Sequence, residues 1–230
     1  MMRDRKEAAP GAAFFSPAEA GATPPFSVCV REHTRDLHRE AERTGFVRDM
    51  LAGRIDRLHY LLWLRNLHAV YDALEQALRS PDGMARAAPF TDPRLCRTQP
   101  LAEDLVTLAG ADWDRLPRVP ETDGYVDVIG AARLSWRLMG HAYTRYLGDL
   151  SGGQLLSGLM AKHLGLRADA LRYYGFSGIP DIPSYRTTLR DRMDAVLHDD
   201  ESAMRDALQG AAEGFEQSIA LSRAIGTATV

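Results

Sequence analysis

Apolar residues recur at intervals of three and four through most of this sequence, which is the spacing that places them along one face of an α-helix. The strongest such stretch covers residues 55–79 and predicts the central core helix. Its apolar positions are Leu58, Leu61, Leu62, Leu64, Leu67, Val70, Tyr71, Leu74 and Leu78. The sequence contains no convincing pair of strands and no internal repeat. The pattern therefore predicts an all-α, single-domain, multi-helix protein.

Weaker patterns and helix-breaking residues predict the elements around this core helix. Ser27 is placed to cap a helix that runs to Arg43, and Thr44-Gly45 interrupts the chain before a short helix over residues 46–51. Further helices are predicted at residues 101–108, 126–164, 185–197 and 201–225. Proline and glycine mark the segments between them: a turn at 80–83, irregular chain at 89–97, a connector at 113–125 and a loop at 173–183.

Length and composition limit the number of domains and the class of partner. With 230 residues, of which 45% are hydrophobic and 26% charged, the chain suits one well-packed domain. A net charge of −3 gives no overall basic field, so nucleic acid is not expected as the main partner. Cys29 and Cys96 are the only cysteines, and because they lack metal-ligand spacing they are expected to be free thiols.

The two ends of the chain differ in composition from its middle. Residues 1–25 are rich in Ala, Pro and Gly, and we expect a disordered arm there, then one domain over 26–226 and a tail over 227–230. The apolar pieces of the arm are too short and too often broken by proline for a signal peptide. Because no window approaches 18 uncharged apolar residues, we expect a soluble, cytoplasmic protein without a membrane anchor.

One glycine-rich stretch, residues 141–154, does not fit ordinary helix packing. Gly148, Gly152 and Gly153 lie inside a segment of helical composition, where each glycine costs about 0.5–1 kcal/mol relative to alanine. The spacing i, i+4, i+7, i+11 predicts one shared helix face made of His141, Arg145, Gly148 and Gly152. Because two of these residues have no side chain, we expect a kink or a backbone that lies close to something flat or bulky.

This stretch also matches two other patterns. Residues 150–154, with the sequence LSGGQ, match the signature loop of ABC-type ATPases, but no G-x-x-x-x-G-K-[ST] phosphate loop accompanies them. Gly148 and Gly152 are also spaced for close packing against another helix. On spacing alone, helix packing stays open beside a ligand-binding notch with Arg145 and Asp149 at its edge.

The residues around the glycines carry a specific resemblance to a known family. The string Tyr143-Thr-Arg-Tyr-Leu-Gly-Asp-Leu-Ser-Gly-Gly-Gln154 resembles the distal-helix signature of heme oxygenases almost letter for letter. Leu37-His38-Arg-Glu-Ala-Glu42 looks like the proximal helix of that family, and Leu189-Arg-Asp-Arg-Met193 is similar to its late basic helix. The similarity extends over residues 28–225, and the distal string is its most specific part.

The resemblance implies roles for two histidines and two acidic residues. His38 falls at the position of the axial iron ligand, and Glu42, one turn later, is placed to accept the other ring N–H. His141 is its rival on the glycine-rich helix, and the resemblance gives His141 a structural role. Asp149 matches the aspartate that organises distal waters, although an aspartate beside glycines also suits bonds to local backbone.

The resemblance also implies a set of residues that would surround heme b. Gly148 and Gly152 would let the helix backbone lie against it, and Arg145 would be a network or helix-positioning residue. The residues near its two carboxylates would be Tyr143, Arg31, Arg186 and Arg190. Arg31 is expected two helical turns before His38 on the same face. Family members commonly have lysine at the first two of the three arginine positions, and arginine keeps the charge but can alter how heme is seated.

The implied activity is the oxidative cleavage of heme, both substrate and cofactor, by O₂ and supplied electrons to biliverdin, CO and Fe²⁺. Asp149 would deliver a proton through ordered water. Because the sequence has no G-x-G-x-x-G loop, the electrons are expected from a separate ferredoxin or NAD(P)H-dependent reductase. The alternatives are a non-catalytic heme carrier or sensor and a thiaminase-like enzyme of the same fold, and the distal string with His38 disfavours the second.

Overall fold

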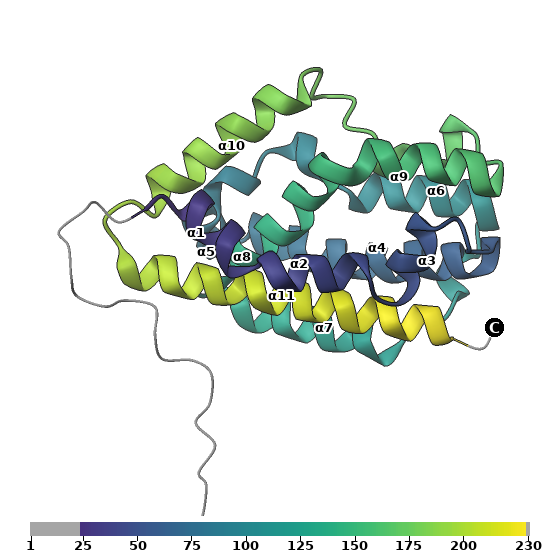
Figure 1. Ribbon diagram of the computed structural model, residues 1–230, viewed down its shortest axis with the longest axis horizontal. Coiled ribbons are helices and arrows are strands. Elements are labelled where there is room, and N and C mark those ends of the chain that lie inside the picture. Colours follow the sequence, from purple (N-terminus) through teal and green to yellow (C-terminus); the bar gives the residue numbers. More distant parts are fainter. Residues whose placement is uncertain (1–23, 229–230) are drawn as a thin grey trace, which may run out of the picture.

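The computed structural model describes residues 24–228, and every regular element within them is helical (Figure 1). The predicted all-α class is therefore confirmed. The predicted N-terminal arm lies outside the described residues except for Pro24 and Pro25, and so do the last two residues of the predicted tail. No helix within this range combines the length and the apolar character needed to cross a lipid bilayer.

The elements follow one another through short connections. The α-helices are α1 (Phe26–His33), α2 (Arg35–Glu42), α3 (Gly45–Leu51), α4 (Arg57–Arg79), α5 (Pro81–Arg86), α6 (Thr98–Ala109), α7 (Pro120–Ala132), α8 (Arg137–Ala142), α9 (Gly148–Leu164), α10 (Ile182–Val196) and α11 (Glu201–Thr227). Single turns of other helix types are η1 (Ala88–Phe90), η2 (Pro93–Leu95), η3 (Trp113–Arg115), η4 (Tyr143–Leu147), η5 (Ala168–Ala170) and η6 (Arg172–Tyr174).

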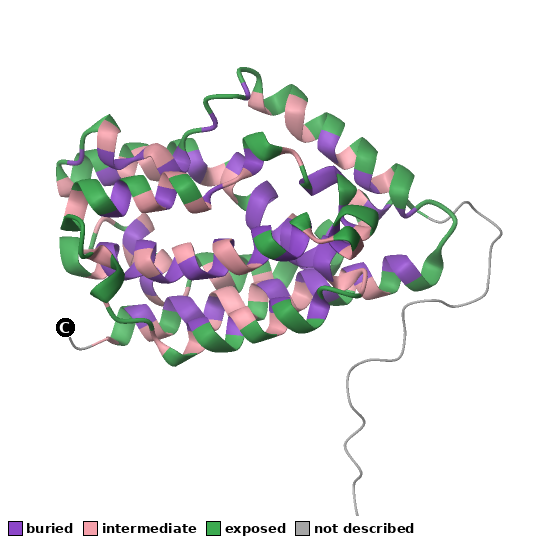
Figure 2. Ribbon diagram, turned by 180° about the vertical axis from the view of Figure 1, so that it is seen from behind, coloured by how far each residue is buried: buried purple, intermediate pink, exposed green. Residues whose placement is uncertain are grey.

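The core is built around α4, as the leucine pattern predicts. Asp56 caps its first turn, because the Asp56 carboxylate accepts a hydrogen bond of 2.9 Å from the backbone N–H of His59. The apolar face of α4 packs against α6, α7 and α11, where Leu64 and Leu74 are fully buried. Each such leucine contributes about 2 kcal/mol. Figure 2 shows buried residues where these helices face one another, whereas α10 is mostly exposed or half-buried.

The N-terminal helix differs from its prediction in two ways. Ser27 does not cap it, because the Ser27 backbone N–H and hydroxyl both donate to the Asp194 carboxylate on α10, at 2.7 Å each. The helix also breaks at Thr34, whose hydroxyl donates to the carbonyl one turn earlier and so competes with the helical backbone. The next interruption, predicted at Thr44-Gly45, is confirmed, since Gly45 has the left-handed φ of 56° that favours glycine.

Two segments predicted to be irregular begin helices instead. Residues 80–83 do not form an isolated turn, because the Ser80 hydroxyl accepts from the Gly83 backbone N–H at 3.1 Å and caps α5. The connector predicted over residues 113–125 ends early, because Pro120 begins α7. Serine at the cap and proline at the first helical position suit a helix start as well as a turn, so the residue types alone did not distinguish them.

The single helix predicted over residues 126–164 is wrong. The chain leaves the helix after Ala132 and enters a new one at Arg137. Ser135 stabilises this break, because its hydroxyl donates to the Ala132 carbonyl at 3.2 Å and accepts from the Arg137 backbone N–H at 3.3 Å. α7 and α8 are therefore separate helices, and the glycine-rich stretch belongs to the second of them and its continuation.

α8 is held in place by a close crossing with α11. A Cβ atom at Gly140 would overlap the backbone of Ala207 and Ala211, and a Cβ atom at Gly210 would overlap the backbone of Arg137. Because neither glycine has a side chain, the two helix backbones touch at this point. The crossing fixes the helix that leads into the glycine-rich stretch.

Candidate functional site

The glycine-rich stretch contains a π turn, η4, between α8 and α9. A π turn closes each hydrogen bond over one residue more than an α turn, so it rotates the residues that follow it. His141 and Arg145 are buried, whereas Gly148 is exposed and Gly152 is half-buried. The prediction that all four share one face is therefore wrong, and only the two glycines lie on the uncovered side.

Gly148 and Gly152 present bare helix backbone on α9. A Cβ atom at either position would meet no atom within 4 Å. Close packing against another helix is therefore not their role among residues 24–228. Gly153 differs, because a Cβ atom there would lie 3.3 Å from the carbonyl oxygen of Tyr174. Two of the three glycines keep a surface open, and the third allows the loop at η6 to approach α9.

Asp149 lies beside this open surface in the first turn of α9, with 14% of its side chain exposed. Its carboxylate accepts one tyrosine hydroxyl on each oxygen. Tyr71 of α4 donates to Oδ2, and Tyr173 of η6 donates to Oδ1 at 2.8 Å. Nη2 of Arg145 lies 3.9 Å from Oδ1. Asp149 thus binds side chains from three other elements and not the local backbone, which was the alternative interpretation.

The charges of this cluster are set by burial and by the partners themselves. Burial raises the pKa of Asp149, while the Arg145 charge and the two tyrosine hydrogen bonds counteract that rise. Burial also raises the pKa of Tyr71 and of Tyr173, so both hydroxyls stay protonated and donate. Burial lowers the pKa of Arg145, but Tyr71, Tyr173 and Asp149 raise it by more, so the guanidinium stays charged.

Arg145 joins the cluster to α11. Its guanidinium lies over the Tyr71 ring, with Cζ 5.1 Å from the ring centroid, and Nη1 donates to Oγ of Ser218 at 3.4 Å. A buried cation in contact with an aromatic ring, a hydroxyl and a carboxylate is well placed to hold a helix in position. This arrangement suits the network role expected for Arg145, which stays a prediction.

His38 lies on α2, a helix in which none of the eight residues is buried. Its side chain is 57% exposed, Nδ1 lies 3.7 Å from Oε1 of Glu42, and its ring meets the Phe215 ring edge-on at 5.7 Å between centroids. The break at Thr34 separates His38 from Arg31, so these two residues do not lie on one continuous helix as predicted. His38 is nevertheless accessible to a ligand.

His141, the rival histidine, lies in a different environment. It is fully buried between α8 and α11, with Nε2 3.6 Å from Oε2 of Glu213 and its ring 6.1 Å from that of Tyr125. The neighbouring His141 ring lowers the pKa of Glu213. A ligand approaching the open side of α9 would not reach this ring, and the placement supports the structural role expected for His141.

Arginines on two helices act electrostatically on Tyr143. Burial raises the pKa of the Tyr143 hydroxyl, whereas the charges of Arg190 on α10 and Arg31 on α1 lower it. Arg186 lies one turn before Arg190, and its Nε is buried without a hydrogen-bond partner among the described residues. We call Arg31, Arg186 and Arg190 the basic rim.

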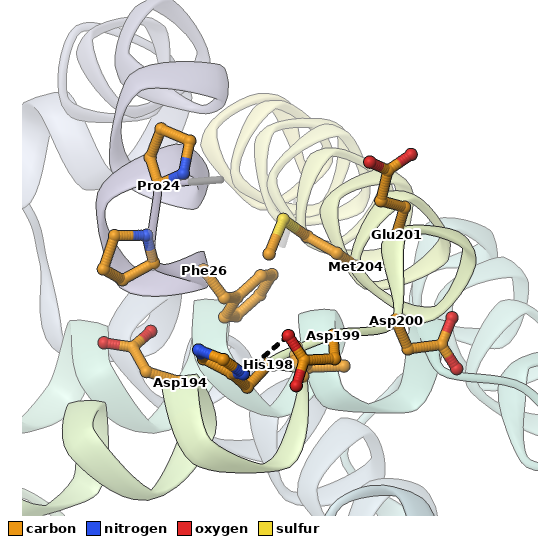
Figure 3. A pocket seen from close by; sticks show the side chains of 10 residues that line it. Pro24, Phe26, Asp194, His198, Asp199, Asp200, Glu201 and Met204 are labelled. Atoms are coloured by element: carbon orange, nitrogen blue, oxygen red, sulfur yellow. Dashed lines mark ion pairs between the residues drawn. The ribbon is translucent and has the colours of Figure 1, made fainter. Parts of the chain in front are cut away.

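A cavity of about 620 Å³ lies apart from these residues, between the start of α1, the end of α10 and the start of α11 (Figure 3). Its walls are acidic and apolar, and none of the predicted site residues lines it. Phe26 lines this cavity and also packs edge-on against Tyr143, with ring centroids 6.3 Å apart. The cavity therefore neighbours the basic rim but is a separate feature.

Two members of the site, Tyr71 and Tyr173, are not predicted from the sequence. The sequence pattern places Tyr71 on the apolar face of the core helix and Tyr173 in a loop. A buried phenol usually finds a hydrogen-bond partner, so a tyrosine on a leucine-rich face was the available signal for Tyr71. No local signal marks Tyr173, because its partner Asp149 lies 24 positions earlier on another element.

Uncovered helix backbone next to a buried acid on α9, together with the basic rim on α1 and α10, suits an all-α protein for a flat, anionic ligand. A profile of the heme oxygenase family matches residues 24–224. Heme oxygenase 1 of Synechocystis sp. is 32% identical over 179 residues, which cover 76% of this chain and 75% of that protein. Heme oxygenase of Pyropia yezoensis is 35% identical over 171 residues, which cover 73% and 72%.

A solved structure agrees with these sequence relatives. The crystal structure of Synechocystis heme oxygenase-1 in complex with heme has a TM-score of 0.81 at 29% identity, covering 86% of this chain and 91% of that one. The chain belongs to the heme oxygenase family. The predicted family, its heme-degrading enzyme class and its use of heme as substrate and cofactor are thereby confirmed.

Proposed function

We propose that this chain cleaves heme to biliverdin, CO and Fe²⁺, with His38 as the iron ligand and Asp149 as the residue that guides the proton. The observation that carries the proposal is the Asp149 carboxylate, which is held by two tyrosine hydroxyls directly beside the uncovered backbone of Gly148 and Gly152. A protein that only carried heme would not need a buried, oriented acid at this place.

Three features of the described residues suit heme as the ligand. The open backbone at Gly148 and Gly152 accommodates a flat ring, since no Cβ atom intrudes. The basic rim offers cations for two carboxylates. The buried Nε of Arg186 has no hydrogen-bond partner within residues 24–228, so it is a donor available to one of them. His38 offers an accessible imidazole, and Glu42 is near enough to orient it.

Heme, when bound, supplies the iron that takes up O₂ and the ring that is cleaved. The residues of this chain then have separate tasks. His38 would bind the iron through one ring nitrogen. Tyr143 and the basic rim would orient the two carboxylates. Asp149 would hold and pass a proton at its carboxylate through an ordered water, while Arg145 keeps α9 in place.

We propose that the electrons for the reaction come from a separate protein. The sequence contains no dinucleotide-binding glycine loop. We propose a ferredoxin or an NAD(P)H-dependent reductase as the donor, docking at the basic rim, because acidic surfaces are attracted to clustered arginines. We also propose that the protein is located in the cytoplasm. Nucleic acid is not expected as a partner.

The test is a turnover assay on the full chain. Hemin is added, then a chemical reductant in air, and the Soret band is followed together with biliverdin absorption. The proposal expects a Soret band that forms and then gives way to biliverdin. A stable Soret band without biliverdin would instead indicate a carrier or sensor, and no Soret band would contradict heme binding altogether.

Two variants separate binding from chemistry. His38→Ala should lose the spectrum of histidine-ligated heme, and an unchanged spectrum would point to another ligand. Asp149→Ala should bind heme normally but form biliverdin at least about 100-fold more slowly, which is the usual contribution of a proton-transfer group. A normal biliverdin yield from Asp149→Ala would overturn the role of Asp149.

A further inference from the structure

We infer that Tyr173 is a positioning residue that fixes the orientation of the Asp149 carboxylate. The inference deepens the proposed function and rests on it for its catalytic meaning. It stands on the geometry of one short segment, residues 172–176, which connects to the carboxylate through a single hydroxyl.

Tyr71 and Tyr173 hold the Asp149 carboxylate by one hydrogen bond on each oxygen. Tyr71 donates to Oδ2, and Tyr173 donates to Oδ1 at 2.8 Å. A carboxylate with a donor on each oxygen cannot turn about its own axis without breaking one of the two hydrogen bonds. Tyr71 belongs to the long core helix α4, which holds it in place. The other hydrogen bond to Asp149 depends on how firmly Tyr173 itself is held.

Buried Asp104 on α6 holds Tyr173 from its amino side. The Asp104 side chain is fully buried, and its two oxygens accept the backbone N–H groups of Arg172 and Tyr173, at 2.9 Å each. Burial raises the pKa of Asp104, and the two backbone hydrogen bonds counteract that rise. Both oxygens of this buried acid therefore bind the backbone of residues 172–173.

Buried Arg97 holds Tyr173 from its carbonyl side. Nη1 of Arg97 donates to the carbonyl oxygens of Tyr173, at 3.1 Å, and of Gly175. The guanidinium also lies over the Phe176 ring, with Cζ 3.9 Å from the ring centroid. Tyr173 is thus fixed at both its N–H and its carbonyl by buried charged side chains, so its hydroxyl points at Asp149 from a rigid base.

Two neighbouring tyrosines distinguish positioning from simple packing. Tyr173 and Tyr174 are both buried, and their rings lie 4.8 Å apart between centroids. Of these two tyrosines, Tyr173 donates to Asp149, whereas the Tyr174 hydroxyl lies beside Tyr60. Tyr174→Phe is therefore a matched control for Tyr173→Phe, since each removes one hydroxyl from the same segment.

The experiment measures the titration of Asp149 directly in the heme-free full chain. Aspartate carboxyl carbons are labelled with ¹³C, and the Asp149 signal is identified by its loss in Asp149→Ala. Tyr173→Phe should raise the titration midpoint of Asp149 by about one pH unit, because a donor to the ionised form is removed. Tyr174→Phe should leave it unchanged. The groups that face Asp149 are Arg145, Tyr71 and Tyr173, with Arg97, Tyr125, Tyr146 and Tyr174 farther away.

A turnover measurement then tests whether the hydrogen bond from Tyr173 to Asp149 affects the reaction. Tyr173→Phe should shift the pH–rate profile of biliverdin formation in the same direction while heme affinity stays within about twofold. In the Asp149→Ala background, Tyr173→Phe should have no further effect on rate, because the residue acts through Asp149. A wild-type chain that forms no biliverdin would contradict the proposed function. An unchanged Asp149 midpoint in Tyr173→Phe, or an equal shift in Tyr174→Phe, would overturn the inference about Tyr173.

Discussion

Two pairs of glycines on neighbouring helices lack a side chain for opposite reasons. Gly140 and Gly210 lie where α8 and α11 cross, and a methyl group at either would overlap the backbone of the other helix. Gly148 and Gly152 lie about two and three helical turns after Gly140, and a methyl group at either would meet no atom of residues 24–228 within 4 Å. The first pair makes a contact possible, and the second pair keeps a contact from forming.

The difference separates stability from function within about a dozen residues. At the crossing, glycine allows backbone atoms to pack at van der Waals distance, so a side chain there would push the helices apart. On α9, glycine carries only the cost of weak helix propensity, with no packing gain in return. A position that costs stability without a contact is the kind of position where a ligand supplies the missing surface.

The crossing should give the largest effect when it is broken. Gly140→Ala should lower the free energy of unfolding by about 3 kcal/mol or more, because the new methyl group overlaps backbone that cannot move independently. Urea unfolding monitored by circular dichroism would measure the loss. A variant as stable as the wild type would show that α8 and α11 do not pack as closely as the structure indicates.

A polar contact anchors α10, and acid should weaken it with a smaller loss of stability than Gly140→Ala causes. Asp92 accepts the Tyr185 hydroxyl of α10 at 2.9 Å, and hydrogen bonds from Arg94 lower the pKa of Asp92 to about 2. Because this pKa lies below that of the unfolded chain, the stabilisation is present above about pH 4 and is lost as the pH falls toward about 2.

The expected loss from Asp92 is at most about 2 kcal/mol. It can be measured as the change in unfolding free energy between about pH 5 and about pH 2.5. Asp92→Asn should show a smaller change than the wild type over the same interval. Equal pH dependence in the two proteins would mean that Asp92 does not anchor α10.

The uncovered glycines should give the smallest effect on stability, and with the opposite sign. Gly148→Ala and Gly152→Ala should raise the unfolding free energy by up to about 1 kcal/mol, because alanine favours the helix and meets no neighbour. Biliverdin formation should fall in both variants. Gly158→Ala is the control, because Gly158 is exposed on the same helix and a Cβ atom there would meet no described residue within 4 Å. If Gly158→Ala also reduced turnover, Gly148 and Gly152 would no longer differ from an ordinary exposed glycine on α9.

The regular part of the fold was predictable where apolar spacing alone decides it. The helices at α4, α10 and α11 lie within a few residues of their predicted ranges, because each buries a periodic apolar face. The break at Ser135 and the π turn η4 were not predictable, since both depend on which hydrogen bonds close locally. The composition of residues 126–164 is helical in either case.

Only those site residues that lie within one continuous sequence motif could be predicted. Asp149 and its flanking glycines lie in the distal string, and the structure places Asp149 beside an open surface. Its partners Tyr71 and Tyr173 come from positions 78 residues before and 24 residues after it. Such pairs are joined by the packing of α4 and η6 on α9, which no spacing within one segment can reveal.

A helix without a single buried residue has a kinetic consequence. α2 carries His38, yet all eight of its residues are at least partly exposed, so little burial opposes its local opening. Its amide protons should therefore exchange with solvent deuterium sooner than those of α4. Hemin bound at His38 should slow that exchange, and mass spectrometry of the peptide covering residues 35–42 would then report occupancy of the site without any need for turnover.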